Sequence, residues 1–321
     1  MDLLQLNDII KSSKNILIMS HINPDGDTLG TMCALYSAIL DNCKKKADML
    51  LMSKLPEIYK FIPYVNFAKH ISKYDKSREY DLVINVDVAS YDRMFESEVF
   101  FKKAKKTINI DHHVTNENYA DFNYVVPEAS SAGEVLYDVL DGLNWKISKN
   151  TAEALYVAIL TDTGSFRYSN TSGKALNTVA KLIDLGVSPV ETYKQCYETY
   201  TKNHVLFQSL CMTNAIFTEN DKIAYIVVYK KDIEKYNVED DCTEGLSEKL
   251  RAINTVEVAF VAKQISANVT KISLRSERID ISQVCVKFGG GGHKLAAGCV
   301  IKAEPNEAAE RIVKELKKII E

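Results

Sequence analysis

Acidic and imidazole side chains recur along the first half of this 321-residue chain, each beside an apolar run of strand-like or helix-like residues. When hydrophobic strands end on such residues, the side chains gather at the carboxyl edge of the sheet, where open α/β folds bind ligands. Carboxylates and imidazoles without thiolates favour Mn²⁺, Mg²⁺ or Zn²⁺ over a soft metal. The sequence therefore predicts a metal site, whose candidate ligands are His21, Asp25, Asp27, Asp87, His112 and Asp162.

The number of carboxylates in this set indicates two ions rather than one. Four converging aspartates would repel one another strongly without cations, and two divalent ions cancel that charge. Ions about 3.5 to 4 Å apart need a shared ligand. Asp87 is the candidate bridge because it ends the apolar run 82–86, which is typical of a central strand. Mn²⁺ is the expected metal, and Mg²⁺ or Co²⁺ would satisfy the same ligands.

Each of these residues also has a purely structural interpretation when it is taken alone. The pair His21 and Asp25 is more often a loop with a capping acid, Asp111 is more often a cap or turn residue, and Asp162 could simply end a helix. Their occurrence together and in order, each beside a strand end or an apolar helix, favours the metal site.

A second signal lies near the end of the chain, in the glycine-rich run 289–298. Glycines let a backbone approach a ligand closely, and N–H groups at a helix start can hold an anion. A glycine run alone is only a flexible turn, but His293 follows this one directly. The residues expected to bind a substrate here are Gly290, Gly291, Gly292 and His293.

Arginine is scarce in this sequence, where seven of the 40 basic residues are Arg. An Arg beside a motif is therefore a candidate for bidentate phosphate binding, which Lys cannot provide. Arg167 follows the Asp162 segment, and Arg275 ends a strand beside Ser276. For Arg275 a surface ion pair with Glu277 or with the nearby Asp280 is the alternative.

The first half alternates strand-like and helix-like runs, which predicts a parallel sheet. The expected strands are 16–20, 48–52, 81–88 and 107–110, and the expected helices are 28–40, 131–140, 151–160, 173–185 and 189–200. After a connecting helix at 201–212 the pattern changes to a second, smaller α/β domain. Its expected strands are 216–217, 223–229, 256–265 and 269–274, and its helices are 243–253, 279–288 and 305–320, the last with Pro305 in its first turn.

Composition fits an ordinary enzyme, with 46% hydrophobic and 26% charged residues. A net charge of -3 and a pI near 6.1 argue against a protein that coats nucleic acid by bulk electrostatics. Seven scattered cysteines without a C-x-x-C pair indicate reduced thiols and a cytoplasmic location. Neither a signal peptide nor a membrane span is expected, since Asp2 and Asp8 interrupt the amino terminus and long apolar runs are missing.

Together, these motifs resemble the DHH phosphoesterase family with its DHHA1 domain, in the nano-RNase (oligoribonuclease) and pAp-phosphatase subgroup. The resemblance covers essentially the whole chain and rests on five motifs in the right order. They are His21-x-x-Pro24-Asp25-Gly26-Asp27, the strand-end Asp87, Asp111-His112-His113, the Asp162 segment and the closing Gly-Gly-Gly-His293-x-x-Ala-Ala-Gly. The resemblance implies an α/β protein with a parallel-sheet DHH domain that has helices on both sheet faces. It also implies a smaller α/β DHHA1 domain, with the active site in the cleft between the two domains. We expect the DHH domain at 1–195, a linker helix region at 196–205 and the DHHA1 domain at 206–321.

The resemblance also implies individual roles. One ion would be held by His21, Asp25 and Asp87, and the other by Asp27, Asp87, His112 and Asp162. The catalytic residues would be Asp87, His113, which contacts the scissile phosphate, and Asp111, which suits the orientation of a ligand histidine. The substrate would be held by Arg275, Ser276 and His293. Apart from the resemblance, the residues themselves suggest Arg167 and Gly290 to Gly292 as further substrate contacts.

The expected function is metal-dependent hydrolysis of short oligoribonucleotides to mononucleotides, with removal of the 3′-phosphate of pAp as a second activity. A phosphodiesterase for cyclic dinucleotides or pApA is the alternative, because it needs the same metals. A non-catalytic nucleotide-binding module is the alternative of another class, but it would require a broken ligand set, and this set is intact. The expected partners are short single-stranded RNA, dinucleotides and pAp. We expect no membrane contact and no stable protein partner, and a homodimer would be compatible with the sequence.

Overall fold

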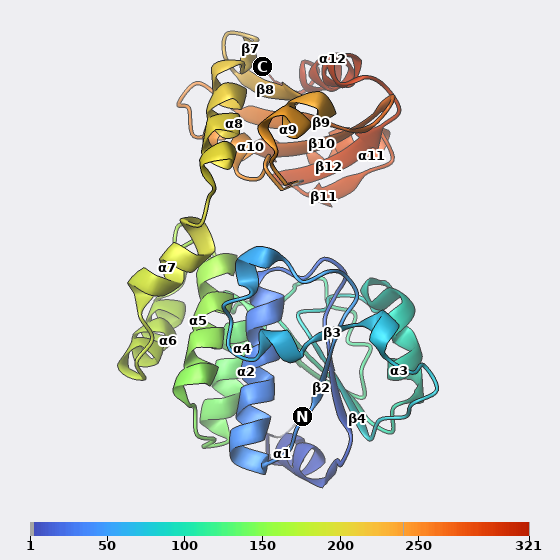
Figure 1. The fold of residues 1–321 in the computed structure, drawn as a ribbon, viewed down its shortest axis with the longest axis vertical. Helices are drawn as coiled ribbons and strands as arrows, with labels where there is room; N and C mark the ends of the chain where they lie inside the picture. Colours follow the sequence, from blue (N-terminus) through green and yellow to red (C-terminus); the bar gives the residue numbers. More distant parts are fainter. Residues whose placement is uncertain (1–2, 240, 321) are drawn as a thin grey trace. The chain divides into compact units, whose positions relative to one another are not determined.

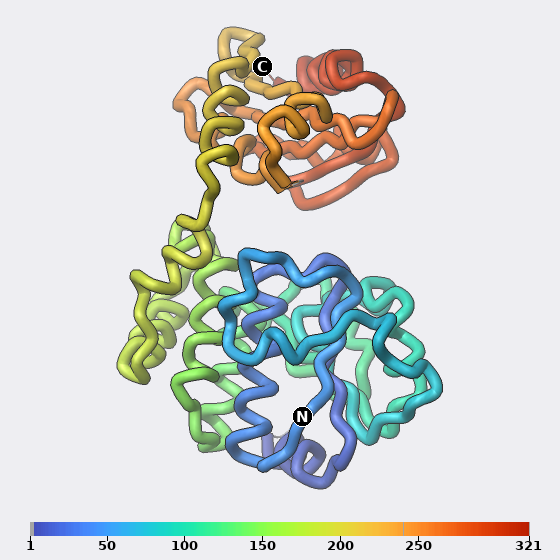
Figure 2. The backbone as a smooth tube through the Cα atoms, in the orientation of Figure 1, coloured from blue at the N-terminus to red at the C-terminus, as the bar shows by residue number. Residues whose placement is uncertain are grey.

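The computed structural model describes residues 3–239 and 241–320, and it divides into two compact units, Met1–Thr199 and Tyr200–Glu321. Figure 2 traces the chain through both units. Each unit has its own six-stranded sheet. None of the helices among the described residues combines the length and the apolar character that crossing a bilayer requires.

Unit 1 contains a parallel sheet with the strand order β3-β2-β1-β4-β5-β6, as the alternating sequence pattern predicts. The residues of β1, β4 and β5 are all buried, which is typical of central parallel strands covered on both faces. The strands are β1 (Ile16–Met19), β2 (Asp48–Leu51), β3 (Lys69–His70), β4 (Leu82–Val86), β5 (Thr107–Asp111) and β6 (Phe122–Val125).

Helices cover both faces of this sheet (Figure 1). Ile16 and Ile18 of β1 pack with the long helices, whereas Leu17 and Met19 pack with the side chains around Phe100 on the other face. The helices are α1 (Leu3–Ser12), α2 (Gly26–Cys43), α3 (Glu98–Lys103), α4 (Ala132–Gly142), α5 (Lys149–Asp162), α6 (Gly173–Asp184) and α7 (Pro189–Tyr197), with short 3₁₀ turns η1 (Glu57–Tyr59), η2 (Val65–Phe67), η3 (Ile71–Lys73) and η4 (Tyr91–Ser97).

Helix α2 lies very close to α5. This contact brings the start of α2 and the end of α5 to the same edge of the sheet. At Gly30 a Cβ atom would stand 2.6 Å from the carbonyl oxygen of Ala154, so only glycine permits this approach. The close contact fixes the first turn of α2 relative to the last turn of α5.

Unit 2 contains a mixed sheet with the order β11-β12-β10-β9-β8-β7, in which β8 and β9 are parallel and the other pairs antiparallel. Val258 and Phe260 of β9 pack with α11 and α12, and Ala259 and Val261 pack with α8, α9 and α10 on the opposite face. The elements are α8 (Lys202–Thr213), β7 (Ile216–Thr218), β8 (Ile223–Val228), α9 (Lys230–Tyr236), α10 (Leu246–Arg251), β9 (Val258–Ser266), β10 (Val269–Ser276), α11 (Ser282–Lys287), β11 (Gly291–His293), β12 (Ala296–Ile301) and α12 (Pro305–Leu316).

The glycine run corrects one expectation from the sequence. It does not open a helix; it follows the end of α11 and leads into the hairpin of β11 and β12. At Gly290 a Cβ atom would stand 2.2 Å from the carbonyl oxygen of Gly298, and Gly292 has a φ of 142°. Tight backbone packing therefore requires glycine at positions 290 and 292. The expectation that this run binds an anion at a helix start is wrong.

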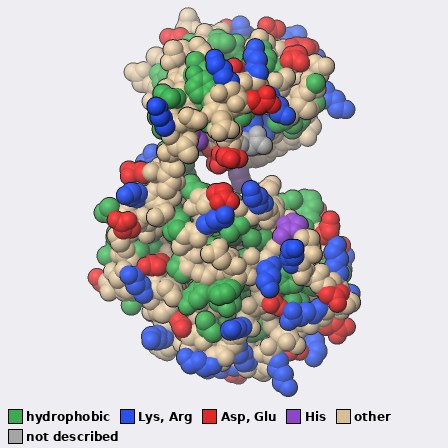
Figure 3. Space-filling view, viewed as in Figure 1, with side chains coloured by type: hydrophobic (Ala, Val, Ile, Leu, Met, Phe, Trp, Pro, Cys, Tyr) green, Lys and Arg blue, Asp and Glu red, His purple; other side chains and the backbone are tan. Residues whose placement is uncertain are grey.

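Lys and Arg side chains are interspersed with Asp and Glu on the face drawn in Figure 3. This mixture agrees with the net charge of -3. The face drawn there therefore carries mixed charge rather than a broad field of one sign.

Candidate metal centre

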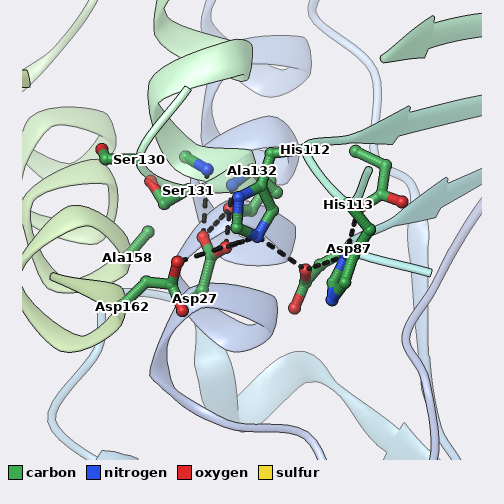
Figure 4. A network of polar contacts seen from close by, with 12 residues as sticks. Asp27, Asp87, His112, His113, Ser130, Ser131, Ala132, Ala158 and Asp162 are labelled. Atoms are coloured by element: carbon green, nitrogen blue, oxygen red, sulfur yellow. Dashed lines mark hydrogen bonds and ion pairs between the residues drawn. The ribbon is translucent and has the colours of Figure 1, made fainter. Parts of the chain in front are cut away.

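The metal-site candidates lie at one edge of the sheet of unit 1. His21 follows β1, Asp87 follows β4, and Asp111 is the last residue of β5, and these three strands are neighbours. Asp27 comes from the first turn of α2 and Asp162 from the last turn of α5. Figure 4 shows the carboxyl groups of Asp27 and Asp162 turned toward the imidazole of His112.

These side chains form three groups, and within each group the ligand atoms lie within 4.8 Å of one another. Asp87 belongs to two of the groups, which gives it a central position. The groups are His21, Asp25 and Asp87; Asp27, His112 and Asp162; and Asp87, Asp111, His112 and His113.

His21 is oriented for use of its Nε2 atom. Its Nδ1 atom lies 2.6 Å from the carbonyl oxygen of Ile22, so the proton belongs on Nδ1. Nε2 lies 3.5 Å from Oδ2 of Asp87 and 2.7 Å from the hydroxyl of Thr28. Burial lowers the pKa of His21, but Asp87, the carbonyl of Ile22 and Asp25 together outweigh this effect and raise the pKa above its ordinary value.

Asp27 is a buried carboxylate held by backbone amides. Its two oxygens accept hydrogen bonds from Ala132 N at 2.8 Å and Gly133 N at 3.0 Å, in the first turn of α4. Burial and the charges of Asp87, Asp162 and Asp25 raise the pKa of Asp27 well above its ordinary value. A cation at this position would relieve that repulsion.

Asp87 has the left-handed backbone conformation, with a φ of 59°. Its N–H donates to the carbonyl of Ile110 at 2.9 Å, which keeps the residue in the plane of the sheet edge. Aspartate tolerates this conformation better than most residues, and such strain is frequent at functional sites. Burial raises the pKa of Asp87, but His21, His113 and Thr28 together outweigh this effect and hold the pKa below its ordinary value.

The oxygens of Asp87 show that the residues fit a cation. Oδ2 accepts a hydrogen bond from Thr28 at 2.6 Å, whereas Oδ1 is buried and forms no hydrogen bond within the described part of the chain. The Nε2 atom of His112 lies 3.6 Å from Asp27, 3.7 Å from Asp87 Oδ1 and 3.7 Å from Asp162. These atoms are too far apart for hydrogen bonds and are arranged for a common ion. The site could therefore bind metal.

Asp162 is supported by a residue that the sequence did not single out. The amide of Asn170 donates to the backbone carbonyl of Asp162 at 3.1 Å and to the carbonyl of Ser130 at 2.9 Å, and it approaches the Asp162 carboxylate at 3.3 Å. Burial raises the pKa of Asp162 to about 6, with further contributions from Asp87 and Asp25 against the opposing effect of His112. Thr28 and Asn170 carry no motif signal, because their roles depend on contacts formed only in the folded chain.

Asp111 orients a different histidine from the one we expected. Its Oδ1 accepts from Nδ1 of His113 at 2.8 Å, and Asn116 holds its other oxygen. The ring of the candidate ligand His112 instead has Nδ1 3.4 Å from the carbonyl of Ala129. The bond to Asp111 outweighs burial and raises the pKa of His113 above its ordinary value.

Arg167 lies in the turn after α5 and outside the three metal-site groups. Its Nε donates to the carbonyl of Gly164 at 2.9 Å, and Ser165 and Phe166 before it have left-handed backbones. The guanidinium is thus partly used to hold its own turn.

In unit 2 the sheet register brings two candidate substrate residues into one row. Arg275 on β10 and His293 on β11 both pair with Ala296 on β12, so their side chains leave the same face of the sheet. Ser276 points to the opposite face, where its hydroxyl accepts from the N–H of Ile279 at 2.8 Å. The Arg275 ion pair is formed with Glu248 of α10 and not with the neighbouring acids that the sequence offered.

Two family models match the chain. The DHH family N-terminal domain matches residues 15–159, and the DHHA1 domain matches residues 220–321. The chain belongs to the DHH phosphoesterase family, in the group that carries a DHHA1 domain. It is therefore a hydrolase of phosphoric ester bonds, and the expected family is confirmed.

Curated relatives match over nearly the whole chain. The Bifunctional oligoribonuclease and PAP phosphatase NrnA of Bacillus subtilis (strain 168) is 29% identical over 307 residues, which cover 94% of this chain and 93% of that protein. The protein of the same name from Thermus thermophilus is 25% identical over 304 residues, covering 94% and 89%. The crystal structure of an exopolyphosphatase-related protein from Bacteroides fragilis has a TM-score of 0.92 at 24% identity, covers 98% of this chain and 95% of that one, and shows the same fold.

Proposed function

We propose that this protein hydrolyses short oligoribonucleotides to mononucleotides and also removes the 3′-phosphate of pAp. The observation that carries the proposal is the convergence of Asp27, His112 and Asp162 near Oδ1 of Asp87, which accepts no hydrogen bond from the described residues. Relatives whose names give both activities match 94% of the chain. Among phosphoesterase activities, this pair is therefore the one with the best support.

The metal site would hold two divalent ions, and Mn²⁺ is the proposed metal. One ion would bind to His21, Asp25 and Asp87, and the other to Asp27, Asp87, His112 and Asp162. When bound, such ions supply positive charge beside the scissile phosphate and lower the pKa of a water molecule toward about 7. The oxygen and imidazole ligands suit Mn²⁺, and the absence of thiolates argues against a soft metal.

The remaining residues of the site would act on the phosphate directly or through a neighbour. His113 would place its imidazole against the scissile phosphate, and its bond to Asp111 fixes the ring through Nδ1, so that Nε2 is the atom directed at the substrate. Because Asp111 favours the protonated ring, His113 would add positive charge where the transition state is most anionic. Asp111 therefore works through His113.

The substrate would be held away from the reacting bond by residues of unit 2. Arg275 and His293 share a face of the sheet and would bind a phosphate group, with the backbone of the glycine run beside them. Ser276 is buried on the opposite face, so it is not part of this proposed phosphate contact. Arg167 of unit 1 is a further proposed phosphate contact. The glycine run that contributes to this grip is Gly290, Gly291 and Gly292. Binding at one remote phosphate would favour short substrates, because recognition then needs only one or two nucleotides.

The proposed partners are short single-stranded RNA, dinucleotides and pAp, without a stable protein partner. The proposed compartment is the cytoplasm. Six of the seven cysteines are buried, which suits reduced thiols in a reducing environment.

A substrate panel tests the proposal. Purified protein with Mn²⁺ would be incubated with short RNA, pAp, pApA, a cyclic dinucleotide and a generic phosphodiester, with products separated by chromatography. We expect mononucleotides from short RNA and AMP from pAp. Asp87→Asn protein provides the control for contaminating nucleases. Preferential turnover of the cyclic dinucleotide would favour the cyclic-dinucleotide phosphodiesterase instead. Binding without release of product from any substrate would favour a non-catalytic module.

A further inference from the structure

Arg275 is held by two hydrogen bonds in unit 2. Its Nε donates to Oε1 of Glu248 at 2.8 Å, and its Nη1 donates to the carbonyl of Leu274 at 2.9 Å. These contacts use two of the five N–H donors of the guanidinium. Three donors stay available for phosphate oxygens, in an orientation that the two bonds fix.

Glu248 is itself held on its other oxygen. The hydroxyl of Ser247 donates to Oε2 at 2.9 Å, so both carboxylate oxygens have partners. Burial raises the pKa of Glu248, but Arg275, Ser247 and a backbone N–H together outweigh this effect and keep the pKa below its ordinary value. The carboxylate is therefore charged at neutral pH and maintains the pair.

The position of Glu248 explains how it reaches Arg275. Helix α10 packs through Leu246 and Leu250 on the sheet face that contains Ala259, and Ala259 is the cross-strand partner of Arg275. Glu248 and Arg275 are both about one-third exposed, at the margin where α10 stops covering the sheet. The row continues through Ala296 to His293, which is exposed. The Glu248–Arg275 pair therefore lies beside an exposed part of this face. There the small residue Ala296 separates the basic side chains of Arg275 and His293.

We propose that Glu248 is a positioning residue that fixes the guanidinium of Arg275 in the orientation used to bind a substrate phosphate. This inference rests on the proposed function, in which Arg275 holds the substrate. The opposite role is a competitor, in which the carboxylate occupies the phosphate position and must be displaced. The two roles predict opposite changes in affinity when the carboxylate is removed.

The experiment compares Glu248→Ala and Glu248→Gln with Arg275→Ala and with the double variant. The matched control is Glu307→Ala, which breaks a Glu–Arg pair with Arg311 on α12, on the other face of the same sheet. Steady-state kinetics would be measured on pApA and on a generic aryl phosphodiester, with metal content and thermal midpoint determined for each variant.

We expect Glu248→Ala to raise KM for pApA by about 10-fold with little change in kcat, the scale on which the loss of a supporting residue acts. Glu248→Gln, whose amide oxygen still accepts from Nε, should recover most of that loss. In the Arg275→Ala background, Glu248→Ala should have no further effect, because the two residues act as one unit. Turnover of the aryl substrate and the Glu307→Ala variant should stay at wild-type values.

Unchanged or lower KM in Glu248→Ala would overturn the inference, as would equal losses in the Ala and Gln variants or additive effects in the double variant. Failure of the wild type on every nucleotide would reject the proposed function instead. In that case titration calorimetry with pAp decides the role of Glu248. Weaker binding in Glu248→Ala supports the inference, and equal binding or no binding to the wild type overturns it.

Discussion

The Nε2 atom of His112 lies 3.7 Å from Oδ1 of Asp87, and Oδ1 has no hydrogen bond within the described part of the chain. A separation of this size between a nitrogen acceptor and a carboxylate oxygen is too long for a hydrogen bond and suits two ligands of one cation. Oδ2 of the same carboxylate faces His21 at 3.5 Å. Asp87 therefore has one oxygen directed to each of the two proposed ligand sets.

The first prediction concerns this shared position. Replacing Asp87 with Asn should lower kcat by at least about 100-fold. Loss of a residue that only supports a metal ligand lowers activity by up to about 100-fold, and loss of a shared ligand should cost at least as much. Asn keeps the size of the side chain and tolerates the left-handed backbone, so a loss of activity would reflect the missing charge. Kinetics and bound metal would be measured together. His21→Asn, which affects one half of the site, should be the milder variant, and comparable residual activity in the two would show that Asp87 is not shared.

The second prediction concerns the metal itself. Protein treated with chelator should lose activity, and Mn²⁺ should restore it better than Mg²⁺, because the ligands are oxygen and imidazole. Since a metal bound to the folded state stabilises it, Mn²⁺ at about 100 times its Kd should add about 2.7 kcal/mol to the free energy of unfolding. Denaturant titrations with and without Mn²⁺ measure this term. Full activity in EDTA after time for exchange would rule out the metal mechanism.

The sequence predicted the parallel sheet and its candidate ligands because strand ends in such a sheet share one edge. His21, Asp87 and Asp111 follow or end buried strands, and this local pattern is visible in the sequence. Partners at large sequence separation were not visible. The sequence suggested Glu277 or Asp280 as the ion-pair partner of Arg275. In the folded chain the partner is Glu248 of helix α10.

The hairpin at the glycine run was also missed, for a different reason. Strand β12 (Ala296–Ile301) begins with two alanines and a glycine, which have low strand propensity, and the preceding glycines indicate only a turn. The strand forms because its neighbour β10 supplies a long antiparallel partner. Pairing with β10 therefore outweighs the low strand propensity of the residues in β12, and the sequence pattern does not reveal this pairing.

The third prediction tests the support of Asp162. Asn170→Ala removes the amide that joins Asp162 to Ser130, so we expect the affinity for Mn²⁺ to fall about 10-fold. Titration calorimetry on metal-free protein measures this change without reference to turnover. Asn42→Ala is the matched control, because Asn42 also joins two segments by its amide but at Lys146, away from the metal-site groups. Equal Mn²⁺ affinity in Asn170→Ala and the wild type would contradict the support role.

The fourth prediction concerns stability and pH at the start of β4. Asp81 pairs with Lys105 and accepts the N–H groups of Asn15 and Lys14, and these contacts lower its pKa to about 2. Because the folded pKa is depressed, the stabilisation is complete above the ordinary value of 3.8 and disappears as the pH falls to about 2. Thermal midpoints of the wild type and Asp81→Asn should therefore differ at neutral pH and converge in acid. A difference that does not depend on pH would contradict this account.

The last prediction separates the grip on the substrate from the chemistry. His293 lies in unit 2, outside every metal-site group, so His293→Ala should leave bound metal unchanged. A hydrogen bond to a charged phosphate contributes about 1.5 to 3 kcal/mol, and binding energy of a remote group can be used at the reacting centre. The kcat/KM for pApA should therefore fall about 10- to 150-fold. A generic aryl phosphodiester, which has no second phosphate, should be hydrolysed almost as before. His70→Ala is the matched control, since His70 is exposed in unit 1 and its ring forms hydrogen bonds with Ser72 among the described residues. Equal losses on the two substrates, or loss of metal, would show instead that His293 supports the catalytic centre.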